Sequence, residues 1–270
     1  MTMASEQPEA LHTFVVPAYG QSPHLRACLD SLSRQTLPSS IVIATSTPHD
    51  GLASIAGEFD ARLAVHAPNA GIGRDWNFAL AQASTSWVTL AHQDDIYLPE
   101  FTEQTLALGN AHPAATLVLT GYRERAGEAV RTNTTMLLVK RLLLELGFLG
   151  RNAISSRGAK LRLLRFGCPI PCPAVTLNMA LLGNLRFRED LKVNLDWEAW
   201  TRLARLEGTF AYAREPLMLH RIHATSETSA AIRQGVRAAE DRLMFDALWP
   251  RPIARLLARA YTLSYETGAG

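Results

Sequence analysis

Short apolar runs alternate with helically spaced apolar residues along the first half of the chain. The apolar runs cover residues 13–17, 41–45, 62–66, 86–91 and 115–120. Between them, apolar side chains recur at helical spacing, as at Leu25, Cys28, Leu29 and Leu32. Strands that alternate with helices are typical of α/β folds. We therefore predict a mostly parallel sheet flanked by helices, with ligands at the carboxyl ends of the strands.

The second half of the chain has a less regular pattern. Apolar spacing predicts helices over 140–148 and 195–206, a return to the sheet over 173–179, and short strands over 210–213 and 217–222. Two closing helices are expected over 230–248 and 253–265. We predict a main domain over 1–229, with residues 230–270 as a helical C-terminal extension packed on it.

Residues 151–167 form a basic segment between these elements. The segment carries Arg151, Arg157, Lys160, Arg162 and Arg165 without one acidic residue. A mobile lid, an anion-facing loop and a solvated linker all remain open, because surface loops are often simply polar.

Composition narrows the class of protein. With 270 residues, 47% hydrophobic and 19% charged, the chain is typical of a globular protein, and its net charge of +2 gives no indication of a nucleic-acid partner. Three cysteines indicate structural thiols in a reducing compartment. The apolar runs fall short of the ~20 residues of a membrane span, and no secretory pattern is visible. We expect a cytoplasmic protein, and the basic stretches at 151–167 and 251–259 leave peripheral contact with the inner face of the membrane open.

Two adjacent carboxylates follow the fourth predicted strand. Asp94 and Asp95 come shortly after the apolar run at 86–91, and Pro99 then opens a helical pattern. Carboxylates at the carboxyl edge of an α/β sheet suit a divalent cation and a phosphate-bearing ligand. Because Asp is also a favoured N-cap residue, capping of the next helix is the alternative.

Other segments carry candidate chemistry of the same kind. Residues 17–19 could border a nucleotide base or form a plain turn after the first strand. A turn at 69–71 precedes a helix whose free N–H groups could face phosphate or simply be capped. Asp196 stands near a helix start, as a general base or an N-cap. Near 220–223, one His or Arg could reach a phosphate or a cation.

In this order, the segments resemble family 2 glycosyltransferases, which have the GT-A fold. The resemblance covers residues 13–229 and rests on VVPAYG, the Asn-x-Gly helix, the HQDD strand end and the LDWE helix. Members of this family transfer a sugar from a nucleotide-diphospho donor to an acceptor hydroxyl with inversion. The resemblance implies a hexosyl- or deoxyhexosyltransferase that uses Mg²⁺ or Mn²⁺. Its acceptor would be a glycan or a lipid-linked molecule in cell-surface polysaccharide or glycolipid synthesis.

The resemblance also implies roles for individual residues. Asp196 falls at the position of the family's catalytic base. Asp94 is the expected metal carboxylate, Asp95 is a ligand or supports one, and His223 is a further metal ligand. The expected donor-binding residues are Pro17, Ala18, Tyr19, Thr45, Asn69, Gly71, Asn77, Gln93, Asp94 and Arg221.

Several positions depart from the family pattern. Thr45 and Ser46 stand where acidic residues are common, one of which contacts uracil, and His92 replaces the first Asp of the Asp-x-Asp motif. Trp76 and Leu195 replace a common Arg and a common Asp. UDP, dTDP and GDP donors therefore stay open. Two alternative functions also stay open, a nucleotide-sugar-binding protein without turnover and a nucleotidyltransferase on a similar sheet.

Overall fold

The computed structural model describes residues 10–223 and 235–267. The strands are β1 (His12–Ala18), β2 (Ser40–Thr45), β3 (Arg62–Val65), β4 (Trp87–Leu90), β5 (Ile96–Tyr97), β6 (Ala115–Ala126), β7 (Ala129–Arg131), β8 (Ala153–Ile154), β9 (Val175–Asn178) and β10 (Thr209–Arg221). The helices are α1 (Leu25–Ser33), α2 (Leu52–Glu58), α3 (Ile72–Ala81), α4 (Phe101–Ala111), α5 (Thr135–Phe148), α6 (Arg157–Leu164), α7 (Met179–Leu182), α8 (Leu195–Arg205), α10 (Val236–Leu248) and α11 (Arg251–Thr267). The predicted α/β fold with a helical C-terminal region is confirmed.

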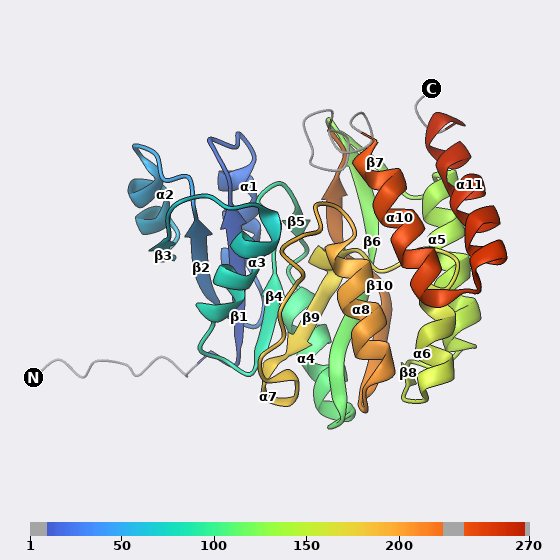
Figure 1. Ribbon diagram of the computed structural model, residues 1–270. Helices are drawn as coiled ribbons and strands as arrows, with labels where there is room; N and C mark the ends of the chain where they lie inside the picture. Colours follow the sequence, from blue (N-terminus) through green and yellow to red (C-terminus); the bar gives the residue numbers. More distant parts are fainter. Residues whose placement is uncertain (1–9, 224–234, 268–270) are drawn as a thin grey trace, which may run out of the picture.

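One mixed sheet runs through the molecule in the order β3-β2-β1-β4-β9-β6-β10-β5 (Figure 1). β3, β2, β1 and β4 are parallel to one another, as the alternating pattern of strands and helices predicts. β9 lies antiparallel between β4 and β6, whereas β10 is parallel to β6 and antiparallel to β5. The parallel arrangement thus describes the N-terminal half of the sheet, and the other half is mixed.

Both faces of the sheet are covered by buried apolar clusters. Successive side chains of a strand point to opposite faces, so Phe14 and Val16 of β1 pack in one cluster with Leu29 of α1. Val15 packs in the other cluster with Trp76 of α3. The cores on both sides hold the strand ends in fixed positions, and these ends carry the candidate site.

The strand β10 is longer than its sequence indicates. Pro216 interrupts the apolar pattern, which predicts two short strands at 210–213 and 217–222. In the structure one strand spans Thr209–Arg221, with irregular register against β6 on both sides of Pro216. A proline within a sheet is tolerated at such an irregularity because it donates no hydrogen bond to the ladder.

The basic segment at 151–167 is packed structure rather than an open loop. It contains β8 and the helix α6, whose Leu163 and Leu164 are fully buried. The side chain of Lys160 is also buried, and its ammonium donates hydrogen bonds to the carbonyl oxygens of Leu206 at 2.6 Å and Gly208 at 2.9 Å. Because these carbonyl partners are distant in the sequence, the basic charge of the segment leaves a lid, an anion-facing loop and a solvated linker open.

The C-terminal helices α10 and α11 pack on the main core. Phe245 of α10 and Ala254 of α11 belong to the same buried cluster as Trp197 of α8. The predicted boundary between 229 and 230 lies outside the described residues and stays a prediction. The three cysteines are free, and burial raises the pKa of each thiol well above its ordinary value, which fits inert structural thiols.

Candidate active site

The ends of three strands bring the candidate residues together. The segment at 17–19 lies at the end of β1, and the turn at 92–95 follows β4. β5, which comes next, pairs with β10, so that residues 220–223 beyond this pairing lie against the turn at 92–95. Two segments from distant parts of the sequence therefore meet at one edge of the sheet.

Asp95 organises the contact between these two segments. Its carboxylate is fully buried and accepts hydrogen bonds from the Arg221 N–H at 2.9 Å and from His220 Nδ1, whose distances to the two carboxylate oxygens are 3.1 and 3.3 Å. Burial alone would lower the pKa of His220, but the charge and hydrogen bonds of Asp95 raise it above its ordinary value. Of the two roles left open for Asp95, this geometry favours support of the site over direct metal binding.

Asp94 contacts a different set of partners. Its Oδ2 accepts a hydrogen bond from His223 Nε2 at 2.7 Å, and its carbonyl oxygen accepts one from Arg221 Nε at 2.8 Å. Burial acts to raise the pKa of Asp94, yet the charge of His92 and the hydrogen bond from His223 lower it below its ordinary value. Asp94 is therefore ionised at neutral pH, which is the form that binds a cation.

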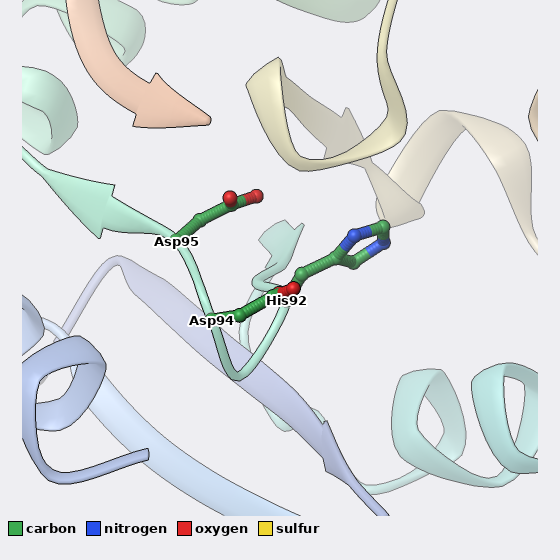
Figure 2. A group of neighbouring side chains, drawn as sticks. All are labelled: His92, Asp94 and Asp95. Carbon is green, nitrogen blue, oxygen red and sulfur yellow. The ribbon is translucent and has the colours of Figure 1, made fainter. Parts of the chain in front are cut away.

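His92 forms a compact group with the two carboxylates (Figure 2). One ligand atom each from His92, Asp94 and Asp95 lies within 4.8 Å of the others, and all three side chains extend from one turn. The Nε2 of His92 is buried without a hydrogen-bond partner among the described residues, and its ring packs 5.2 Å from that of Trp76. An unpaired imidazole beside an ionised carboxylate fits a divalent cation.

Gln93 connects the turn to the end of β1. Its side-chain Oε1 accepts from the Tyr19 N–H, and its Nε2 donates to the Tyr19 carbonyl oxygen, both at 3.1 Å. This pair of bonds fixes the backbone at 17–19 while the Tyr19 side chain stays 54% exposed. Pro17, Ala18 and Tyr19 thus border the cluster, and their contact with a donor stays a prediction.

The end of β2 presents hydroxyl groups instead of carboxylates. Thr45 is buried, and its Oγ1 accepts from the Thr47 N–H at 3.0 Å; Thr47 Oγ1 in turn accepts from the Gly20 N–H at 2.8 Å. The Oγ of Ser46 is buried, and no partner for it lies within 10–223 or 235–267. Ser46, next to Thr45, was not among the predicted donor-binding residues.

The N-terminal part of α3 packs closely against the segment at 186–189. Asn77 Oδ1 accepts from the Phe187 N–H at 2.7 Å, and Asn77 Nδ2 donates to the Phe187 carbonyl oxygen at 2.9 Å and to Glu189 at 3.2 Å. Asn69 Oδ1 accepts from the Gly71 N–H at 2.8 Å, and Gly71 has a φ of 102°, a backbone conformation that favours glycine. Asn77 is therefore engaged in packing, whereas Asn69 and Gly71 lie exposed before the helix. Donor contacts of all three stay predictions.

Asp196 lies at the start of α8, half-buried near the cluster. Burial raises the pKa of Asp196 above its ordinary value, although the hydrogen bond from the Trp197 N–H at 2.7 Å and the charges of Lys140, Arg237 and His92 act against this. A carboxyl group with a raised pKa binds a proton more readily than an ordinary one, as a general base requires.

The family follows from a comparison of sequences. A model described as glycosyl transferase family 2 matches residues 13–178, which is more than half of the chain. The chain belongs to this family. No curated protein sequence matches it at a significant level. The predicted resemblance is thus confirmed, and the HQDD turn at 92–95 lies inside the matched region.

Solved structures share the fold at low identity. S. aureus TarS in complex with UDP-GlcNAc is similar with a TM-score of 0.63 and 17% identity, over 93% of this chain and 71% of that one. The mannosyltransferase PcManGT from Pyrobaculum calidifontis, in complex with GDP-Man and Mn²⁺, is similar with a TM-score of 0.58 and 17% identity, over 96% of this chain and 76% of that one. Glucosyl-3-phosphoglycerate synthase from Mycobacterium tuberculosis was solved in complex with Mn²⁺, UDP and glucosyl-3-phosphoglycerate. It has a TM-score of 0.55 and 19% identity, over 85% of this chain and 78% of that one.

The structure also places two further histidines against the carboxylates. His92 was not among the predicted site residues, and His220 was only one of the candidates left open at 220–223. The signal for His92 was its place at the head of the motif, whereas the pairing of His220 with Asp95 depends on the contact between β5 and β10. Within the described residues, no helix combines the length and the apolar character that crossing a membrane requires.

Proposed function

We propose that this glycosyltransferase is inverting and metal-dependent, and that it moves a hexosyl or deoxyhexosyl group from a nucleotide-diphospho-sugar to an acceptor hydroxyl. The observation that carries the proposal is the ionised Asp94 beside His92, at a sheet edge that also presents Tyr19 and Ser46. Proteins of similar fold, solved with UDP-GlcNAc or with GDP-Man and Mn²⁺, support the proposed classes of donor and cation. The family match favours sugar transfer over the nucleotidyltransferase alternative.

His92 and Asp94 would hold the cation, with His223 kept against Asp94 and with Asp95 fixing the surrounding backbone. When bound, a divalent cation offsets the charge that develops on the leaving diphosphate. Because an imidazole nitrogen suits transition metals better than Mg²⁺, we propose Mn²⁺ as the preferred ion.

Asp196 would accept the proton of the acceptor hydroxyl, and its half-buried place at the start of α8 favours this role. A positioned general base contributes roughly 10²–10⁴-fold to a rate. For the acceptor we propose a glycan or lipid-linked molecule of cell-surface polysaccharide or glycolipid synthesis, as the family resemblance implies.

A donor screen followed by a turnover assay tests the proposal. Thermal unfolding is measured with UDP-, GDP- and dTDP-sugars, each with and without Mn²⁺, since a ligand that binds the native state raises the melting temperature. The stabilising donor is then assayed for release of nucleoside diphosphate with acceptor extracts. We expect one donor to stabilise the protein only with the metal and to be consumed.

Asp196→Asn separates the proposed base from the binding site. The variant should bind the donor like the wild type and lose about a hundredfold or more in turnover. The matched control is Asp190→Asn, at an exposed carboxylate paired with Arg188, and it should keep both properties. A wild type that binds the donor without any turnover would instead support the nucleotide-sugar-binding alternative. Undiminished turnover in Asp196→Asn would contradict the base assignment.

A further inference from the structure

The helix α5 exposes a continuous apolar stripe. Its outward residues recur at helical spacing, and the C-cap residue Leu149 continues them. Each is between 47% and 64% exposed: Leu138, Val139, Leu142, Leu146 and Leu149. Single exposed apolar residues are ordinary on protein surfaces, but a contiguous group marks an interaction surface.

The orientation of this stripe is fixed by the rest of the helix. Leu137, Leu144 and Phe148 on the opposite side are buried in the core. Thr134 caps the first turn by accepting a hydrogen bond from the Leu137 N–H at 3.3 Å, and Glu145 forms an ion pair with Arg214 at 2.8 Å. The stripe therefore faces outward because the other face of α5 is already packed.

The sequence on both sides of the stripe is basic. Between 132 and 167 it has seven basic residues, at 140, 141, 151, 157, 160, 162 and 165, against a single acid, Glu145, which is paired with Arg214. Of the seven, Lys160 is buried and does not contribute to the surface. Arg162 donates to the Gly147 carbonyl oxygen at 3.1 Å, at the C-terminal end of α5. There, Arg151 and Arg162 line a cavity of about 370 Å³ together with Leu149 of the stripe.

A second helix at the same end of the molecule has a similar surface. Figure 1 shows α5, α6 and α11 at the end opposite β3, and α5 and α11 contribute to one core cluster. On α11, Ile253 and Leu256 are 42% and 69% exposed, and Arg255 and Arg259 beside them are exposed as well. Apolar and cationic side chains thus occur together on both helices.

We propose that this end of the molecule docks on the surface of an anionic lipid bilayer, with the stripe of α5 inserted among the lipid headgroups. Leucines flanked by cations match such a surface, because the apolar side chains enter the boundary of the acyl region and the cations pair with lipid phosphates. At 14 residues, α5 is shorter than the ~20 residues of a membrane span, so the contact is peripheral. The proposal does not depend on the sugar-transfer function.

Vesicle co-sedimentation of the whole chain tests this docking. One set of vesicles mixes phosphatidylcholine with phosphatidylglycerol, and the other contains phosphatidylcholine alone. We expect the wild type to sediment with the anionic vesicles and to be released as salt rises, because salt screens the charge attraction. A wild type that stays in solution with the anionic vesicles overturns the proposal.

Two variants identify the surface that binds. The double variant Leu142→Glu/Leu146→Glu should lower partitioning at least about tenfold, since it removes apolar area and adds repulsion from the lipid. Its control, Leu181→Glu, changes an equally exposed leucine of α7 and should partition like the wild type. Glu is a good helix-forming residue, so the double variant and its control should both keep their helices. Circular dichroism and thermal unfolding check that both variants fold.

A charge variant keeps the test decisive if the double variant does not fold. Arg151→Glu changes an exposed side chain outside the helices and should weaken binding to anionic vesicles several-fold, with a smaller dependence on salt. Equal partitioning of the folded variants and the wild type contradicts docking through α5. A wild-type dimer that the double variant converts to monomer, without a change in vesicle binding, would show that a second copy of the chain covers this face and overturn the proposal.

Discussion

Replacement of Asp95 by Asn removes one charge from the buried centre of the site while keeping its shape. The carboxylate is fully buried and accepts from the Arg221 N–H and from His220, so both bonds are charge-assisted. Such bonds contribute about 1.5–3 kcal/mol each. Because the His220 side chain is 31% exposed, its share is discounted for solvent screening. We expect Asp95→Asn to lower the free energy of unfolding by about 2–4 kcal/mol.

The same substitution should also weaken cation binding. Asp95 holds the backbone at 220–223, from which His223 reaches Asp94, and loss of a residue that positions a metal ligand typically costs about 10–100-fold in affinity. Urea unfolding gives the stability, and calorimetric titration with Mn²⁺ gives the affinity. Asp190→Asn, at an exposed ion pair, is the control and should change neither value. If Asp95→Asn unfolds at the same urea concentration as the wild type and binds Mn²⁺ equally well, the assigned role of Asp95 is wrong.

Three further substitutions test separate parts of the account. If His92 binds the cation, Mn²⁺ bound to the wild type should show coupling to a nitrogen nucleus in pulsed electron paramagnetic resonance. His92→Asp should abolish this coupling and raise the affinity for Mg²⁺ relative to that for Mn²⁺. A wild-type spectrum without the coupling excludes His92 as a ligand. Because burial raises the pKa of Asp196, turnover should fall with decreasing pH through a pKa above the ordinary Asp value. If the residual turnover of Asp196→Asn falls at low pH in the same way, the pH dependence belongs to another group. Burial lowers the pKa of His12 from 6.5 to about 3, so that between these values only the unfolded chain binds a proton at this side chain. The contribution of His12 should therefore lower the free energy of unfolding by about 1.4 kcal/mol per pH unit as the pH drops from about 6.5 to about 3. His12→Asn should reduce that slope in urea unfolding at several pH values, and an equal slope in both proteins would refute a neutral buried His12.

The N-terminal half of the fold could be predicted because its signals are local. The apolar run at 13–17 and the helical spacing from Leu25 to Leu32 are each sufficient for one element, and both agree with β1 and α1. The passage of β10 through Pro216 could not be predicted, since pairing with β6 outweighs the local preference of proline. Lys160 likewise appears solvated in the sequence because its carbonyl partners belong to 206–208.

The candidate site shows the same division. The carboxylates Asp94 and Asp95 are visible as a motif, and their placement at the sheet edge follows from the strand before them. Their side-chain partners differ, because Asp95 meets His220 whereas Asp94 meets His223, and these contacts depend on the pairing of β5 with β10. Asn77 illustrates the converse, because a family position suggests a donor contact while its polar atoms pair with Phe187.

Calorimetric titration with the nucleoside diphosphate of the best donor tests the central claim most directly. The wild type and Asp94→Ala are compared, each with Mn²⁺ and with a chelator. We predict that the nucleotide binds the wild type tightly only when Mn²⁺ is present, and that Asp94→Ala removes this metal dependence together with most of the affinity. Equal binding by the wild type with and without Mn²⁺, or by Asp94→Ala with Mn²⁺, would contradict a metal and diphosphate site at Asp94.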